Sequence, residues 1–364
     1  MKNDTSKTAR NLAMAAALCT AGLVTLLVSF AAPSRSGYKL IREIPLPQVT
    51  GWDYLSVDLE ARRLYVASNG GAIVFDVDAE KIVGNVPDPP LKGGAGLVHG
   101  VAVARDFNRG FLSHEVPPSV IIFDLKSLAQ IGVTPTDAGT DAVLYDPVSK
   151  RVFTFNGKKE GVHDASVIDA ATGKAAGTIR LPGEPEFGVA DGAGHVYVNI
   201  ASKSSLAQID SKTLKVTATW PLAPCKEPSG LAIDAAHHRL FAGCDNKLMA
   251  MVDGDTGKVI GTVPIDDGVD ANAFDPGTGY AFSSNGEGGS LTIAHEDSPD
   301  KLSLVENVKT SSGARTMAID LKTHRVFLMA GKFGAGRPKP SPDNPHGYPE
   351  IEKGTAKLLI LGRQ

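Results

Sequence analysis

The sequence predicts an all-β fold, a seven-bladed β-propeller whose last blade is completed by a strand from the N-terminal side of the chain. A frame like that of residues 141–153 recurs seven times along the 364 residues. Each copy is followed by short apolar segments separated by turn residues, and the last copy is one strand short. A repeat of about 40–45 residues with four strands per copy is typical of propeller blades, which stack into a closed ring.

The frame combines an opening polar residue, an apolar strand, an acidic turn residue and a closing aromatic residue. Its spacing runs from 41 residues (Ser229 to Asp270) to 46 (Asp53 to His99), and it opens at Asp53, His99, Asp141, Glu186, Ser229, Asp270 and Arg315. Five residues later, six of the seven copies carry an aspartate, at Asp58, Asp146, Asp191, Asp234, Asp275 and Asp320. An aspartate at a strand end accepts hydrogen bonds from backbone N–H groups two residues on, so we expect a tight turn there.

A second half follows each frame, with an apolar strand that ends in an acid, a turn, and another strand. The acids are Asp76, Asp124, Asp169, Asp210 and Asp253, and His295 takes this place in the sixth copy. The seventh copy supplies two strands within residues 317–330 and one within 357–361. We therefore expect the segment 38–46 to complete the last blade and close the ring with both ends of the chain.

Residues 1–35 differ from the rest of the chain. Lys2, Lys7 and Arg10 precede the uncharged, mostly apolar run 12–32. A basic head followed by an apolar run predicts a secretory signal peptide, and the length of the run equally allows an uncleaved N-terminal membrane anchor. In both cases residues 36–364 are exported, so we expect a periplasmic or secreted protein, or one anchored in a membrane and facing outward.

Composition and motifs exclude several functions. The formal net charge of −3 gives no basic field for nucleic acid, and we expect no nucleic-acid partner. The sequence contains no Walker loop, zinc-protease helix, nucleophile elbow or pair of CxxC motifs. No catalytic residue is assigned on this basis.

Several motifs resemble those of the YVTN-repeat β-propellers, in particular the YncE-like group. The motifs are Trp-Asp-Tyr-Leu-Ser-Val-Asp at 52–58, Asp-Ala-Val-Leu-Tyr-Asp-Pro at 141–147, Gly-Leu-Ala-Ile-Asp at 230–234 and Gly-Ala-Arg-Thr-Met-Ala-Ile-Asp at 313–320. The resemblance extends from Tyr38 to Gln364 and implies a propeller, but no single chemistry, because proteins with this repeat differ in function. The sequence departs from the repeat at Ser-His-Glu-Val, residues 113–116, and at His295.

The residues that open the frames are the candidate ligand-binding site. In a propeller the innermost strands begin beside the central channel, so these side chains would meet at its mouth: Asp53, His99, Asp141, Glu186, Asp270 and Arg315. Converging carboxylates repel one another or attract a cation, and Ca²⁺ or Mg²⁺ suits oxygen ligands. The alternative is a polar rim that simply stays hydrated. If chemistry occurs, Glu186 and His99 are the acid–base candidates and Arg315 anchors an anion.

These observations lead to three hypotheses. The first is an exported propeller that binds a small molecule or an envelope protein through the channel mouth. The second is a lactonase or lyase in the same mouth, assisted by a divalent metal. The third is a structural module in an envelope complex, since propellers often serve as scaffolds.

The cysteines predict one disulfide, between Cys225 and Cys244. Cys225 enters the first strand of the fifth copy and Cys244 ends its second strand. Neighbouring antiparallel strands bring these two ends together, and an oxidising compartment permits the bond. The alternative is a pair of buried free thiols.

Overall fold

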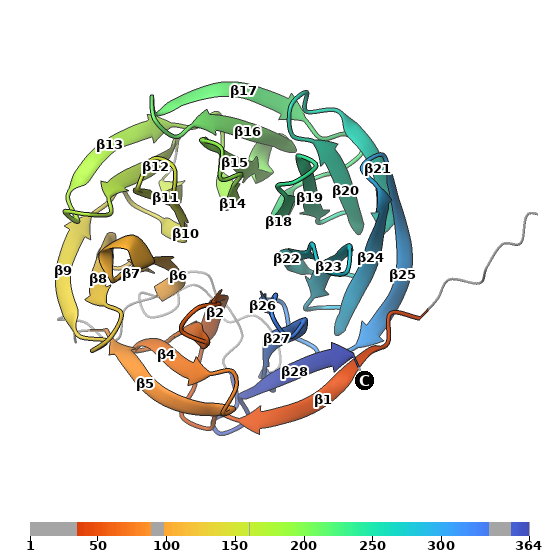
Figure 1. Cartoon of the computed structure of the whole chain (residues 1–364), viewed down its shortest axis with the longest axis horizontal. Helices are drawn as coiled ribbons and strands as arrows, with labels where there is room; N and C mark the ends of the chain where they lie inside the picture. Colours follow the sequence, from red (N-terminus) through yellow and green to blue (C-terminus); the bar gives the residue numbers. More distant parts are fainter. Residues whose placement is uncertain (1–34, 89–97, 160, 335–350, 364) are drawn as a thin grey trace, which may run out of the picture. The chain divides into compact units, whose positions relative to one another are not determined.

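The computed structural model describes residues 35–88, 98–159, 161–334 and 351–363. Seven four-stranded antiparallel sheets follow one another round a ring, each with one strand near the centre and one at the outside (Figure 1). This confirms the predicted seven-bladed propeller.

Each blade takes consecutive strands of the chain. Blade 1 consists of β2 (Trp52–Asp58), β3 (Arg63–Ser68), β4 (Gly71–Asp76) and β5 (Lys81–Pro87). Blade 2 consists of β6 (Val98–Ala104), β7 (Arg109–His114), β8 (Ser119–Asp124) and β9 (Gln130–Pro135). Blade 3 consists of β10 (Thr140–Asp146), β11 (Arg151–Lys159), β12 (Val162–Asp169) and β13 (Ala175–Arg180). Blades 4 and 5 consist of β14 (Pro185–Ala190), β15 (His195–Ile200), β16 (Ser205–Asp210) and β17 (Lys215–Pro221); and β18 (Pro228–Asp234), β19 (Arg239–Cys244), β20 (Leu248–Asp253) and β21 (Val259–Pro264). Blade 6 consists of β22 (Val269–Asp275), β23 (Tyr280–Asn285), β24 (Ser290–Ser298) and β25 (Lys301–Lys309).

Blade 7 is built from both sides of the chain. Its inner strands are β26 (Met317–Asp320) and β27 (Arg325–Ala330), followed by β28 (Lys357–Arg363). The outermost strand is β1 (Tyr38–Pro45), which pairs antiparallel with β28 from Tyr38 opposite Arg363 to Pro45 opposite Lys357 (Figure 1). The predicted closure of the last blade by the segment 38–46 is therefore confirmed.

The aspartates of the repeat terminate strands as predicted. Asp58 accepts a hydrogen bond from the backbone N–H of Ala61 at 3.1 Å, at the end of the inner strand of blade 1. In the outer hairpin of blade 5, Asp253 accepts bonds from the N–H groups of Asp255 and Thr256. These short-range bonds satisfy the turn backbone without a helix.

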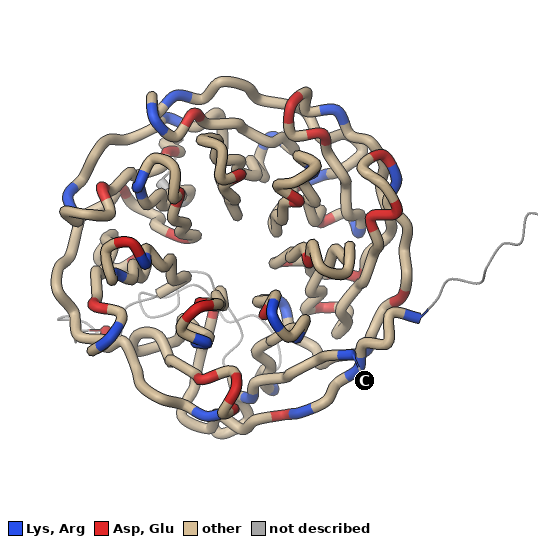
Figure 2. Tube along the Cα trace, in the orientation of Figure 1, with Lys and Arg blue, Asp and Glu red and all other residues tan. Residues whose placement is uncertain are grey.

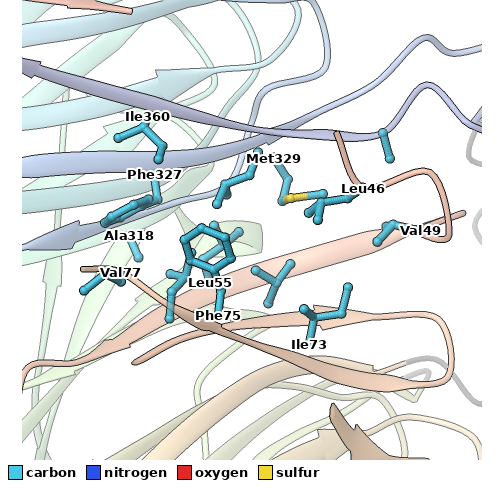
Figure 3. Packing of buried hydrophobic residues seen from close by; sticks show 14 residues of the cluster. Leu46, Val49, Leu55, Ile73, Phe75, Val77, Ala318, Phe327, Met329 and Ile360 are labelled. Atoms are coloured by element: carbon cyan, nitrogen blue, oxygen red, sulfur yellow. The ribbon is translucent and has the colours of Figure 1, made fainter. Parts of the chain in front are cut away.

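The core lies between the blades, where the face of one sheet packs against the next. At the interface that closes the ring, Phe75 and Leu55 of blade 1 face Phe327, Met329 and Ile360 of blade 7 (Figure 3). The phenylalanines, Met329 and Ile360 are fully buried. This apolar interface holds the two ends of the repeat array together and supplies the main free energy of closure.

Three interfaces in the described part of the ring also carry a side-chain contact that we call an interblade clamp. In a clamp, the aspartate that ends one inner strand binds a basic side chain of the next blade. The clamps are Asp58 with Arg105 at 2.6 Å, Asp275 with His324 at 2.7 Å, and Asp320 with Arg62 at 2.6 Å. The third clamp joins blade 7 to blade 1, so it spans the closure of the ring.

Replacing Arg62 with glutamine should lower the free energy of unfolding by about 2 kcal/mol, because it leaves the carboxylate of Asp320 buried without its cation. The side chain of Asp320 is 1% exposed, whereas Asp78, the second partner of Arg62, is 55% exposed. The control is Asp78→Asn, which should change the free energy of unfolding much less, because this ion pair is exposed to solvent. Equal stability of the two variants in denaturant unfolding would show that the clamp does not contribute to closure.

Candidate functional site

The inner strands place the predicted residues by a shared backbone irregularity. Asp53, His99, Asp141, Glu186 and Asp270 are each the second residue of their inner strand. In all five strands the pairing register with the second strand shifts at this point, for example between Trp52 and Leu55 and between Val98 and Val101. A bulge takes residues out of the ladder and re-aims their side chains. The repeat thus places the second side chain of the inner strand at an equivalent position in each of these five blades.

His99 is the centre of the charged group. Its Nδ1 lies 2.7 Å from Asp53 Oδ2 and 3.3 Å from Asp141 Oδ1, and its Nε2 lies 3.1 Å from Glu115 Oε2. Burial alone would lower the pKa of His99, but Asp141, Asp53 and Glu115 outweigh it and raise the pKa to about 10. His99 is therefore an imidazolium at neutral pH that donates both N–H groups to carboxylates.

Arg315 is the second cation. Although it precedes β26 rather than lying within it, its Nη1 is 3.1 Å from Asp270 Oδ2 and its Nη2 is 3.8 Å from Asp53 Oδ1. Ser229 Oγ donates a hydrogen bond to Asp270 Oδ1 at 3.3 Å. Burial raises the pKa of Asp270, Arg315 lowers it, and Asp53 and Asp141 raise it further, to about 6.

The contacts of these two cations run from blade to blade. Together with the bond from Ser229 to Asp270, they connect six blades in the order Ser229, Asp270, Arg315, Asp53, His99 and Asp141. Glu186 of blade 4 is partly exposed, and its charge helps to raise the pKa of the buried Tyr54. We call Asp53, His99, Glu115, Asp141, Glu186, Asp270 and Arg315 the mouth cluster. Acidic positions lie on the inner strands of six blades, all except β6 of blade 2 (Figure 2).

Glu115 was not among the predicted site residues. It follows β7, on the return toward the third strand, rather than opening an inner strand. Glu115 is 8% exposed, and its carboxylate forms a hydrogen bond with His99. The signal that could have found it is the departure from the repeat at residues 113–116.

Two aromatic side chains meet next to the mouth cluster, from blades that are far apart in the ring. Tyr54 of blade 1 and Phe187 of blade 4 contact each other edge to face, with ring centroids 5.1 Å apart. Each directly follows a mouth residue, Asp53 or Glu186, in its strand. Tyr54 is 7% exposed, and burial is the main cause of its raised pKa. The aromatic contact therefore bridges the inner strands of blades 1 and 4 beside the charges.

Comparison with known proteins shows the fold. No protein-family model matches the chain. No curated protein matches it either. Among solved structures, the hydrazine synthase of Kuenenia stuttgartiensis is similar with a TM-score of 0.65 and 14% identity, over 77% of this chain and 92% of that one. A chain of the mitotic checkpoint complex is similar with a TM-score of 0.70 and 12% identity, over 98% of both chains. At these identities the likeness concerns the propeller fold alone.

The mouth cluster could hold a divalent cation only by rearranging. Ligand atoms of Asp53, His99 and Asp141 lie within 4.8 Å of one another. Ca²⁺ and Mg²⁺ take oxygen ligands, which Asp53 and Asp141 offer and an imidazole does not. Because His99 donates to Asp53 and contacts Asp141, an ion between them would have to displace the imidazolium.

The predicted disulfide between Cys225 and Cys244 is confirmed. The two Cα atoms are 5.4 Å apart, and both side chains are buried beside Leu222 and Leu231. The bond ties the segment before β18 to the end of β19. A disulfide persists in an oxidising compartment, so it indicates an extracellular or equivalent location.

The predicted signal peptide or anchor, residues 1–35, lies outside the described residues except for Arg35. Within residues 35–88, 98–159, 161–334 and 351–363, no helix has the length and apolar character that crossing a bilayer requires.

Proposed function

We propose that this protein is an exported propeller that binds a small ligand carrying a positive charge at the mouth cluster. The cluster combines five carboxyl groups, those of Asp53, Glu115, Asp141, Glu186 and Asp270, with two cationic side chains, His99 and Arg315. Solvent reaches the acids, since the side chains of Asp53, Asp141 and Asp270 are 15–20% exposed. An ammonium or guanidinium group fits this acidic surrounding.

The observation that carries the proposal is the repeated placement of ionisable groups at a position where neither the turns nor the packing between blades requires them. The turns already use the aspartates at the far ends of the inner strands, such as Asp58. Packing uses the apolar residues between the blades. Gathering partly buried carboxylates costs free energy, as the raised pKa of Asp270 indicates, and a bound cation would offset that cost.

Aromatic residues next to the cluster support a ligand with an organic body rather than a bare ion. Trp52 directly precedes Asp53, is partly exposed, and packs on Phe333 with ring centroids 5.7 Å apart. The face of an indole ring attracts organic cations. Export, and membership of the YVTN-repeat, YncE-like propellers, belong to the same proposal; the disulfide and the repeat motifs support them.

The test replaces Asp141, Glu186 and Asp270 together, with Asn, Gln and Asn. In thermal-shift and calorimetric titrations with putrescine, arginine and choline, at least one amine should stabilise the wild type and have little effect on this variant. A matched control replaces the exposed acids Asp78, Asp255 and Asp300 with Asn, which changes the net charge equally. This control should bind as the wild type does.

The proposal fails if no amine distinguishes the wild type from the triple mouth variant. A protein partner instead of a small ligand would appear as an envelope protein whose cross-linking to the wild type is lost in the mouth variant. Thermal unfolding without ligand checks that the mouth variant folds, because Asp141 and Asp270 also contact the cations His99 and Arg315.

The convergence of Asp53, His99 and Asp141 within 4.8 Å favours a second candidate, a lactonase or lyase assisted by a divalent metal. In it, Asp53 and Asp141 would hold the ion in place of the His99 imidazolium, and Glu186 or the displaced His99 would transfer the proton. Hydrolysis of lactone substrates that requires added Ca²⁺ or Mg²⁺ and is abolished by Asp141→Asn would favour this candidate over simple binding.

A further inference from the structure

A second group of ionisable side chains lies between blades 5 and 6, at the far end of the inner strand of blade 5. Asp234 ends β18, whereas the mouth residue Ser229 is near the start of that strand. His237 belongs to the turn that follows, and Glu296 lies in β24 of blade 6. This group shares no residue with the mouth cluster and has no part in the function proposed above.

The position of Asp234 is one where other blades form an interblade clamp. Arg62 and His324 each lie nine residues after their frame opens, at Asp53 and Arg315, and each binds the aspartate of the preceding blade. In blade 6, which opens at Asp270, the same position is Gly279. The residue that approaches Asp234 from blade 6 is instead an acid, Glu296, whose backbone N–H bonds the carbonyl of Gly279. A carboxylate thus lies where two other interfaces have a basic side chain.

The side chains are arranged as ligands. Asp234, His237 and Glu296 each offer one ligand atom, and the three atoms lie within 4.8 Å of one another. His237 Nδ1 is 2.5 Å from Asp234 Oδ2. Asp234 is 4% exposed, and Glu296 Oε1 is buried without a hydrogen-bond partner among the described residues. Two adjacent carboxylates, one with an unsatisfied buried oxygen, call for a positive charge between them.

We propose that Asp234, His237 and Glu296 form a binding site for a first-row divalent metal ion, with Zn²⁺ as the best match. One imidazole nitrogen and two carboxylate oxygens are a ligand set that zinc accepts at about 2.0–2.2 Å, whereas Ca²⁺ and Mg²⁺ would take oxygens only. His237, whose side chain is 55% exposed, provides access from solvent and leaves room for water as a further ligand. The ion would replace the missing clamp between blades 5 and 6.

The neighbouring charges set the conditions for binding. Arg239 donates to the carbonyl of His237 and pairs with Asp253, so one cation is already close to the site. Metal ligands bind in their deprotonated forms, so the test is made at about pH 8 with untagged protein.

The experiment titrates ZnCl₂ in competition with a chromophoric chelator and measures the melting temperature in parallel. The wild type should bind one zinc ion per chain and melt at a higher temperature with zinc. Glu296→Gln and His237→Asn should each lower the affinity more than about tenfold. His238→Asn is the matched control, because His238 is a neighbouring exposed histidine that pairs with Asp255. It should bind zinc as the wild type does.

Two further variants keep the result interpretable. Glu296→Gln should fold at least as stably as the wild type without metal, because it removes a like charge beside Asp234, so loss of binding cannot be ascribed to unfolding. His99→Gln separates this site from the mouth cluster and should leave zinc binding unchanged. Absence of zinc binding in the wild type, undiminished binding in Glu296→Gln, or loss of binding in His99→Gln alone would each overturn the proposal.

Discussion

Replacing His99 with glutamine is expected to abolish most of the loss of stability that the wild type undergoes as the pH rises from about 7.5 to 10. The pKa of His99 is raised from 6.5 to about 10 in the folded protein. A group with a raised folded pKa stabilises the protein fully below its unfolded pKa, and this contribution is lost as the pH rises through the folded pKa. Each unit by which the pKa is raised in the folded state corresponds to about 1.4 kcal/mol, so the whole contribution is about 5 kcal/mol, of which roughly 3 kcal/mol is lost between pH 7.5 and 10.

Denaturant unfolding at several pH values measures this directly. The range above about pH 7.5 lies above the pKa of Asp270, about 6, and that of Glu296, about 7, so His99 dominates the change. His195→Gln, at a histidine whose side chain is 43% exposed, serves as the control and should keep the wild-type slope. A His99→Gln protein that lost stability with pH as steeply as the wild type would show that His99 is not held as an imidazolium.

Removing the disulfide by replacing Cys225 and Cys244 with alanine is expected to lower the free energy of unfolding by about 3 kcal/mol. The bond closes a loop with a sequence separation of 19, and a cross-link of that span limits the conformations of the unfolded chain by about this amount. Intact mass after alkylation under non-reducing conditions reports the bond, and denaturant unfolding reports its contribution. Two alkylated thiols in exported wild-type protein, or a cost below about 1 kcal/mol, would contradict this expectation.

The repeat was predictable because the same short-range hydrogen bonds end the strands in each blade. Asp58 and Asp253 end strands through hydrogen bonds to residues two or three positions further on, so the signal is contained in a few adjacent residues. Alignment of the seven copies then placed Asp53, His99 and Asp141 at equivalent positions, and equivalent positions in a ring converge. The missing strand of the last blade pointed to β1 for the same reason, since a blade with three strands leaves an open edge.

The contacts that were not predicted join residues without a shared local pattern. Tyr54 and Phe187 meet from blades 1 and 4, and nothing in either strand specifies which aromatic residue lies opposite. Glu115 reaches His99 from the end of a second strand, outside the aligned frame. The interblade clamps draw on different positions, as Arg62 and Arg105 illustrate, so only three-dimensional structure shows which aspartate each cation binds.

The pairing of β1 with β28 delays completion of the ring during synthesis. β1, which begins at Tyr38, is made before every other strand of the ring, whereas its partner β28, which ends at Arg363, is the last strand of the ring to be made. Until then blade 1 lacks its neighbour, and the side chains of Phe75 and Leu55 lack the residues of blade 7 that cover them in the closed ring (Figure 3). Contacts so distant in sequence form slowly and leave unpaired edges open to aggregation. The incomplete ring therefore needs protection from aggregation, for example by chaperones, until β28 has been made.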